Sequence, residues 1–104
     1  ETYNVTRDIP MEGRFVLCTQ FQRAAVSIPA NIAEGYKKLS KADKLRFLNI
    51  SQGSLEECRY YIILSRDLSY INNNTYNELI GSLEETSKLL NSYIRGVLNK
   101  QLAK

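Results

Sequence analysis

Apolar residues recur at intervals of three and four over most of the chain, the spacing that places them on one side of an α-helix. In the last third of the sequence, this pattern predicts a helix over 73–101 with one side facing a core. The run Asn72–Asn74 can supply its capping oxygen, and Thr75 with Glu78 also fits a capping box. The stripe consists of Ile80, Leu83, Ser87, Leu90, Ile94 and Val97.

The same spacing predicts two earlier helices. One covers 41–68, with Ser40 as its N-cap, and carries the stripe Leu45, Leu48, Leu55 and Ile62. The other covers 12–34 and carries the stripe Phe15, Cys18, Phe21, Ala25, Ile28 and Ile32. Pro29 is expected to kink this helix rather than break it, and Gly35 to form its C-terminal cap.

Residues 1–10 form a short apolar segment that stops at Pro10 and is typical of the end of another helix. Long helices with short connections pack antiparallel. The predicted fold class is therefore all-α: a single domain over 1–104, built as an antiparallel up-down-up-down four-helix bundle whose first helix is mostly missing from this chain.

Composition removes several classes of chemistry. The 104 residues include no histidine and only two cysteines, Cys18 and Cys58, so an imidazole base and the usual Cys/His zinc site are excluded. We expect no catalytic residue, no cofactor and no metal, hence no enzyme, in a reduced cytoplasmic setting. The two cysteines are equally far from position 38, so they can form a disulfide or remain buried thiols. No apolar run approaches the roughly 18 residues of a membrane span, and we expect neither a membrane nor a small-molecule partner.

The net charge of +3 is unevenly distributed. Residues 35–50 hold five basic side chains against one acidic side chain, and residues 86–104 hold four basic and no acidic ones. An antiparallel bundle brings both segments to one end. The resulting basic pole is defined here as Lys37, Lys38, Lys41, Lys44, Arg46, Arg95 and Lys100.

Two interpretations of this pole remain open. The seven side chains can contact the phosphates of a nucleic acid, with Tyr36 beside them stacking on a base. Alternatively, the basic residues are a solvated face that complements the negative ends of the helix macrodipoles.

The run Arg23–Gly35, RAAVSIPANIAEG, resembles the signature of the 23S rRNA intervening-sequence protein family, also called four-helix-bundle proteins. The resemblance continues in register over about 12–100. Further matching segments are Arg46–Leu48, Gly53–Leu55 with Glu57, Leu68–Ile71 and Tyr76.

This resemblance implies a left-handed four-helix bundle that assembles as a ring, often a pentamer. The family's genes were first noticed inside insertions in ribosomal RNA genes, which suggests a connection with RNA. The accessory protein of diversity-generating retroelements, a basic pentamer that binds nucleic acid, is similar in fold, a weak guide to function.

The chain departs from the family pattern in two places. The common Arg-Arg pair is Gln22-Arg23, and residues 1–10 match only the end of the first helix. The apolar surface that this helix would cover must then be buried by a neighbouring subunit or by residues preceding Glu1.

The signature residues are expected to act in structure or at an interface. Glu34 lies near a helix C-terminus, where a carboxylate is unfavourable, so it needs a cation from its own chain or a neighbour. Gly53 and Ser54 indicate close approach of another helix. Of the adjacent Tyr60 and Tyr61, one can face the core while the other, pointing outward, is a candidate subunit contact. The set comprises Arg23, Ser27, Pro29, Asn31, Glu34, Gly35, Gly53 and Ser54.

These observations favour a non-enzymatic homo-oligomer, with a pentamer preferred, that acts as an RNA-binding adaptor through its basic pole. The alternative is a protein-protein interaction scaffold with no role in nucleic-acid binding, in which the groove beside helix 12–34 holds a partner helix.

Overall fold

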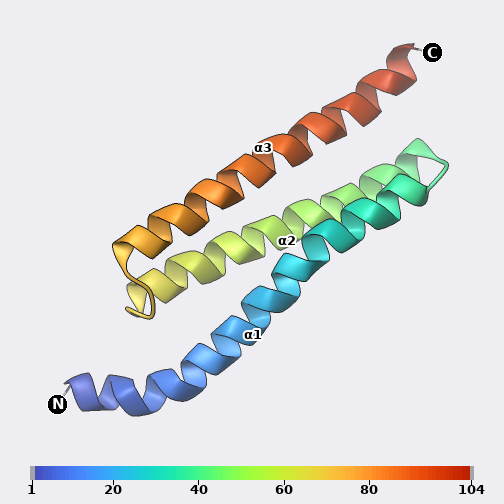
Figure 1. The fold of residues 1–104 in the computed structure, drawn as a ribbon. Coiled ribbons are helices and arrows are strands. Elements are labelled where there is room, and N and C mark those ends of the chain that lie inside the picture. The colour runs from blue at the N-terminus through green and yellow to red at the C-terminus, as the bar shows by residue number, and fades with distance from the viewer. Residues whose placement is uncertain (1, 104) are drawn as a thin grey trace.

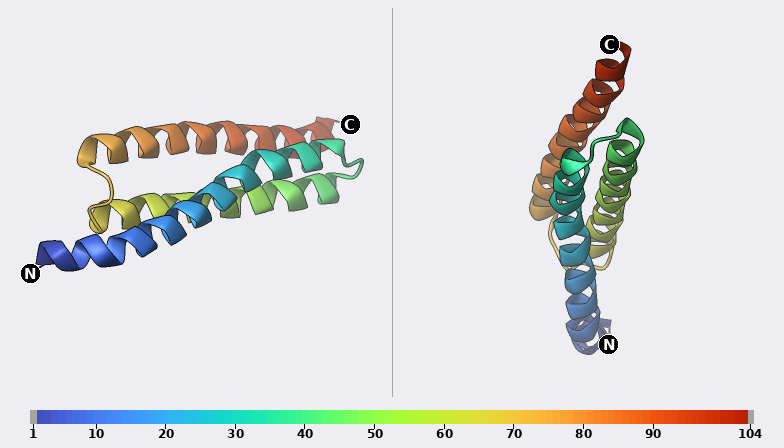
Figure 2. Two further views of the ribbon diagram at one scale, coloured as in Figure 1. Left: turned by 60° about the horizontal axis from the view of Figure 1, so that its bottom comes forward. Right: turned by 90° about the vertical axis from the view of Figure 1, so that its right-hand side faces the viewer.

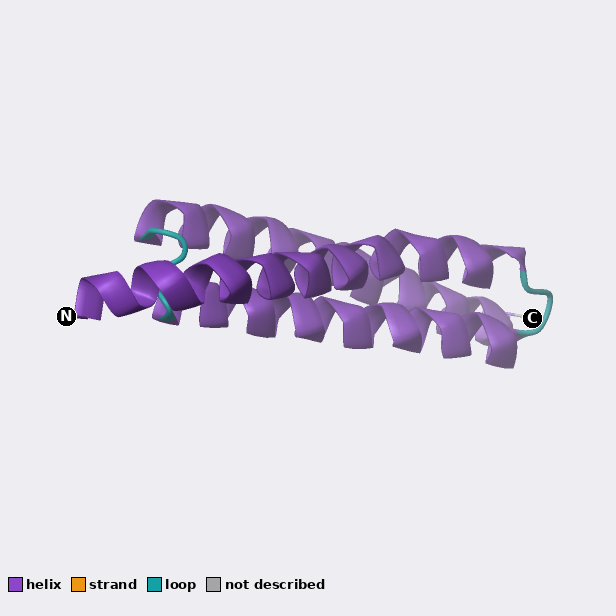
Figure 3. Cartoon of the chain, turned by 90° about the horizontal axis from the view of Figure 1, so that it is seen from below, coloured by secondary structure: helices purple, strands orange, loops and turns teal. Residues whose placement is uncertain are grey.

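The computed structural model describes the backbone of residues 2–103 and the side chains of residues 12–100. Three helices make up this part of the chain: α1 (Thr2–Lys37), α2 (Lys41–Asp67) and α3 (Asn73–Ala103). Figure 3 shows them joined by two short connections, and no strand occurs within residues 2–103. The protein is therefore all-α over its described length.

Helix α1 is longer than the sequence pattern predicted. It runs without interruption from Thr2 through Pro10 and Pro29 to Lys37, where the end of one helix at 1–10 and a second helix at 12–34 were expected. The separate first element was therefore wrong for this structure. Each proline removes one backbone hydrogen bond and crowds the carbonyl four residues earlier, but its fixed φ is helical, and α1 continues through both prolines despite this cost.

Helix α2 has well-defined ends. Ser40 caps its first turn as predicted, because the Ser40 hydroxyl accepts a 3.1 Å hydrogen bond from the amide of Asp43. At the other end, Tyr70 N–H donates to Ser65 C=O at 2.8 Å and Ser69 N–H donates to Arg66 C=O at 2.9 Å. This pair of bonds is a Schellman motif, and it places Ser69 in the left-handed region at φ 63°.

Helix α3 begins just after its capping residue. The side-chain oxygen of Asn72 accepts a 2.8 Å hydrogen bond from the amide of Thr75. The asparagine run thus supplies the cap, as predicted, and Thr75 lies inside the helix rather than at the head of a capping box.

Helix α2 is the central element of the packing. Helices α1 and α3 both pack on it, while no Cα atom of α1 lies within 8 Å of one in α3 over the described residues. In Figure 1, α2 lies between α3 and the N-terminal part of α1, which crosses α2 towards the α1–α2 connection. The core consists of Ala24, Ile28, Leu48, Leu55, Cys58, Ile62, Leu83 and Leu90. Most of these belong to the predicted stripes, but the prediction for the start of the 12–34 stripe was wrong, because Phe15 is 72% exposed and Cys18 is also exposed.

The two ends of the molecule carry different segments. The α1–α2 connection and the last turns of α3 lie at one end, whereas the α2–α3 connection and the first turns of α1 lie at the other (Figure 1). The N-terminal turns of α1 extend past the α2–α3 connection (Figure 2). The segments that carry the basic pole therefore share one end.

Close helix contact occurs at a different glycine from the expected one. A Cβ on Gly35 would lie 3.2 Å from both the carbonyl oxygen of Lys44 and Cβ of Phe47, whereas a Cβ on Gly53 would meet nothing within 4 Å. Gly35 lies inside α1 and no glycine of the described chain has positive φ, so Gly35 is not a C-terminal cap. It permits α1 and α2 to approach, and Gly53 faces open space.

Candidate nucleic-acid interface

The structure places three of the predicted basic residues around one groove. This pole groove, of about 1310 Å³, lies between the end of α1, the start of α2 and the last turns of α3. Lys41, Lys44 and Lys100 line it together with Tyr36 and Tyr93. The remaining lining residues are Leu39, Ser40, Ala42, Leu45, Gly96, Val97 and Asn99.

Lys44 is held in place within the pole groove. Its ammonium nitrogen donates a 3.0 Å hydrogen bond to the backbone carbonyl of Tyr36 and lies 5.7 Å from the centre of the Tyr36 ring. The carbonyl belongs to the last turn of α1, where backbone oxygens lack helical partners. This contact joins the end of α1 to the start of α2 and fixes one positive charge beside an aromatic face.

The other four predicted basic residues do not line the pole groove. Lys37 and Lys38 lie 3.3 Å and 4.0 Å from opposite carboxylate oxygens of Glu34. These lysines supply the cation that the sequence required for Glu34, and they come from its own chain. Arg46 pairs with Asp43 at 3.7 Å, and Arg95 donates a 3.3 Å hydrogen bond to the Ser92 hydroxyl.

Sequence reasoning missed Tyr93 and Leu39 as members of the site. Tyr93 lies seven residues, or two helical turns, before Lys100 on α3, so the same helix face carries both. That spacing was the available signal. Leu39 lies in the α1–α2 connection and is 99% exposed. No local sequence pattern predicts that this leucine is exposed.

A second groove lies between α1 and α3, whose backbones are farther apart than those of the helix pairs that include α2. This apolar groove, of about 860 Å³, shares Tyr36 and Tyr93 with the pole groove. Leu89, which is 73% exposed, stands on its α3 side. Its other lining residues are Pro29, Ile32, Ala33, Lys37, Thr86 and Leu90.

Comparison with known proteins decides the family. The sequence profile described as 23S rRNA-intervening sequence protein matches residues 1–92. The chain belongs to this family. No curated protein matches it.

A solved relative of this family member supports the assignment. It is a crystal structure from Bacteroides thetaiotaomicron VPI-5482, described as a protein of unknown function from the S23 ribosomal protein family. The two chains are 32% identical and superpose with a TM-score of 0.74, over 88% of this chain and 86% of the other.

In this family member, part of the signature forms a polar contact between α1 and α2. The Ser54 hydroxyl donates to the Ser27 hydroxyl at 2.8 Å, and the Asn31 amide donates to the same Ser27 oxygen at 2.9 Å and to the Ser27 carbonyl at 2.8 Å. Ser51, which the sequence did not single out, donates to the Ile28 carbonyl at 2.9 Å. These hydrogen bonds join the two helices where they pack against each other.

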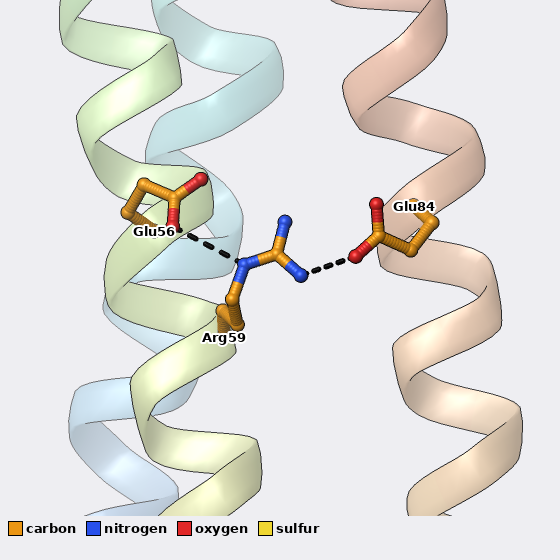
Figure 4. Close-up of polar contacts among 3 residues, drawn as sticks. All are labelled: Glu56, Arg59 and Glu84. Atoms are coloured by element: carbon orange, nitrogen blue, oxygen red, sulfur yellow. Dashed lines mark hydrogen bonds and ion pairs between the residues drawn. The ribbon is translucent and has the colours of Figure 1, made fainter.

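Arg59 joins α2 to α3 on the surface of the bundle. Figure 4 shows its guanidinium reaching from α2 to Glu84 on α3 while also bonding Glu56, at 3.2 Å, on its own helix. The hydrogen bond that Arg59 donates to the Glu84 carboxylate is the main reason that the pKa of Arg59 is raised, with Glu56 contributing. The arrangement is an inter-helix clamp.

The two cysteines are free and differ in environment. Cys58 is buried in the core, and burial together with the charge of Glu57 raises the pKa of its thiol. Cys18 is exposed. The sequence allowed either a disulfide or two buried thiols, and the structure has neither, because both cysteines are free and only Cys58 is buried. Within the described residues, no cluster of three potential metal-ligating side chains occurs, and no helix there is long and apolar enough to cross a membrane.

Proposed function

We propose that this protein is a non-enzymatic, RNA-binding adaptor that acts in the cytoplasm and contacts RNA through its basic pole. The observation that carries the proposal is the convergence of Lys41, Lys44 and Lys100 on one groove that also presents Tyr36 and Tyr93. Lysines beside aromatic rings are the combination used by proteins that bind nucleic-acid strands.

The charge at this groove is available to a ligand. Among the described side chains, no carboxylate lies within 4.0 Å of Lys41, Lys44 or Lys100, in contrast to Lys37, Lys38 and Arg46. The N-terminus of α2, which begins at Lys41, adds the positive end of a helix macrodipole to the same place. These lysines are therefore the principal phosphate contacts in the proposal. Lys37 and Lys38 share the single carboxylate of Glu34, so that group adds one net positive charge near the groove.

A charge-matched pair of variants tests the proposal. Lys41/Lys44/Lys100→Gln removes three positive charges from the pole groove, and Arg14/Arg23/Lys88→Gln removes three from elsewhere. Fluorescence anisotropy with a labelled RNA at low salt should show a loss of about tenfold or more for the first variant and little change for the second. Equal losses would mean attraction by net charge alone, and no binding by the wild-type protein would refute the proposal.

We also propose that the protein self-associates, because the apolar groove leaves hydrophobic surface exposed. In this proposal, α1, α2 and α3 are three helices of an antiparallel up-down-up-down four-helix arrangement, and a helix of a second copy takes the fourth position. Exposed apolar grooves of this kind mark interaction sites.

The exposed side of α2 has the chemistry to fill that groove. Ile50, Gly53, Glu57 and Tyr60 follow one another at helical spacing on this side, and Ile50 and Tyr60 are exposed. Glu57 on this side and Lys37 at the edge of the apolar groove are opposite in charge. A head-to-tail contact closes into a ring where its rotation permits, and the family resemblance favours a pentamer.

A further inference from the structure

The pole groove is apolar as well as basic. Leu39 is 99% exposed and Tyr36 is 72% exposed, although both lie among lysines at the tip of the molecule. Val97 and Leu45 extend the apolar lining towards α3 and α2. The lysines alone are sufficient for solubility and for attracting phosphates. The exposed apolar side chains therefore indicate that a ligand also makes apolar or stacking contacts here.

Tyr36 and Tyr93 lie where the two grooves meet. Both tyrosines line the pole groove and the apolar groove, one from α1 and the other from α3. The Lys44 ammonium is 5.7 Å from the centre of the Tyr36 ring, and Lys100 lies two helical turns beyond Tyr93. Aromatic surface and positive charge are thus within the reach of neighbouring nucleotides.

These two kinds of contact distinguish single strands from duplexes. In a duplex, the bases are stacked on each other and only phosphates and groove edges are presented, whereas a single strand can place its bases on aromatic side chains. We propose that the pole groove selects single-stranded RNA, with bases against Tyr36 and Tyr93 on the pole-groove side, away from the apolar groove that a second copy would fill, and phosphates against Lys41, Lys44 and Lys100. This inference rests on the proposed RNA-binding function.

The test compares two labelled RNAs and two variants. The RNAs are an unstructured single strand of about 12 nucleotides and a blunt duplex of the same length, within the range of known single-strand site sizes. The variants are Tyr36→Leu and Phe15→Leu. Phe15 is also 72% exposed on α1 but is far from the pole, so it is a matched control for loss of an exposed aromatic ring.

The expected result is at least about tenfold tighter binding of the single strand than of the duplex. Tyr36→Leu should weaken binding of the single strand about tenfold and leave binding of the duplex unchanged. Tyr36→Trp should retain the single-strand affinity of the wild type, and Phe15→Leu should change neither affinity. Circular dichroism of each variant confirms that the helices are retained.

Three outcomes overturn the inference. Equal affinity for both RNAs, or unchanged single-strand binding by Tyr36→Leu, would leave RNA binding intact but show that bases are not stacked. Displacement of the RNA by an equal concentration of a glutamate-rich peptide would show a site for acidic protein segments instead. No binding of either RNA would refute the proposed function itself, which separates the two failures.

Discussion

The hydroxyl of Ser51 donates a 2.9 Å hydrogen bond to the backbone carbonyl of Ile28, which directly precedes Pro29 in the C-terminal third of α1. Ser51 is completely buried, and its bond joins α2 to α1 across the core. Sliding or rotating α2 relative to α1 would separate the two atoms and break this bond. The contact therefore helps to set how α1 and α2 meet, and with it the position of the pole groove at their joined ends.

Replacing Ser51 with alanine should lower the free energy of unfolding by about 1 kcal/mol, because a net buried hydrogen bond is lost. Urea unfolding followed by circular dichroism measures the change. Ser82→Ala is the control. Ser82 is solvent-exposed and lies away from the ends of α3, so its replacement changes helix propensity by the same amount without removing a buried hydrogen bond. Equal stabilities for the two variants would show that the Ser51 bond contributes nothing.

Ser69→Gly should stabilise the protein. Ser69 occupies the left-handed position of the Schellman motif at φ 63°, which glycine adopts without the steric cost borne by other residues. The expected gain in the free energy of unfolding is about 1 kcal/mol, read from the midpoint of a urea or thermal transition. A destabilised Ser69→Gly variant would contradict the assigned end of α2.

The glycines at 35 and 53 should respond to alanine in opposite directions. In Gly53→Ala, the added methyl group meets no neighbouring atom within 4 Å, and alanine has the higher helix propensity. This variant should therefore raise the free energy of unfolding by about 0.5–1 kcal/mol. Gly35→Ala places a Cβ 3.2 Å from the Lys44 carbonyl oxygen, so it should lower that free energy as α1 and α2 are forced apart. Both measurements use the same unfolding assay, and a stabilised Gly35→Ala variant would refute the close approach.

Self-association is tested by two variants that each destroy one of the proposed surfaces. Leu89→Arg puts a charge into the apolar groove, and Tyr60→Arg puts one on the exposed side of α2. Each variant alone should be monomeric in size-exclusion chromatography with light scattering, because each lacks one half of every contact. Mixed together, they should form a one-to-one dimer and nothing larger, since one intact groove meets one intact α2 surface.

This experiment also distinguishes the other occupants of the groove. A wild-type protein that is monomeric would mean that no second copy fills it. A mixture that remains monomeric, or a single variant that still assembles, would place the contact between copies on other surfaces.

The helices and the grouping of lysines were predictable because both follow from local spacing. The stripe ending at Ile62 and the cap at Ser40 needed only the helical repeat and a hydroxyl before the first turn. Two basic segments at the same end followed from short connections between long helices. The continuation of α1 through Pro10 was not predictable in this way, since proline is favoured in the first turn of a helix and disfavoured in its interior, which pointed to a helix boundary there.

Tertiary contacts account for the features that the sequence did not reveal. Gly35 and Gly53 are both glycines in helical segments, and only the path of the neighbouring helix decides which one is crowded. Ser51 has the appearance of an ordinary helical serine until the Ile28 carbonyl is placed beside it. Glu34 could have been paired with Lys37 from their spacing of three residues, which would have reduced the predicted set of free cations.

The salt dependence of RNA binding tests the central proposal most directly. The logarithm of the association constant should fall linearly with the logarithm of salt concentration, by about 0.7 for each phosphate of a single strand that is neutralised. Lys41/Lys44/Lys100→Gln should therefore reduce the slope by about 2, while Arg14/Arg23/Lys88→Gln should leave it unchanged. The same slope for the wild type and for Lys41/Lys44/Lys100→Gln would contradict phosphate binding at the pole groove.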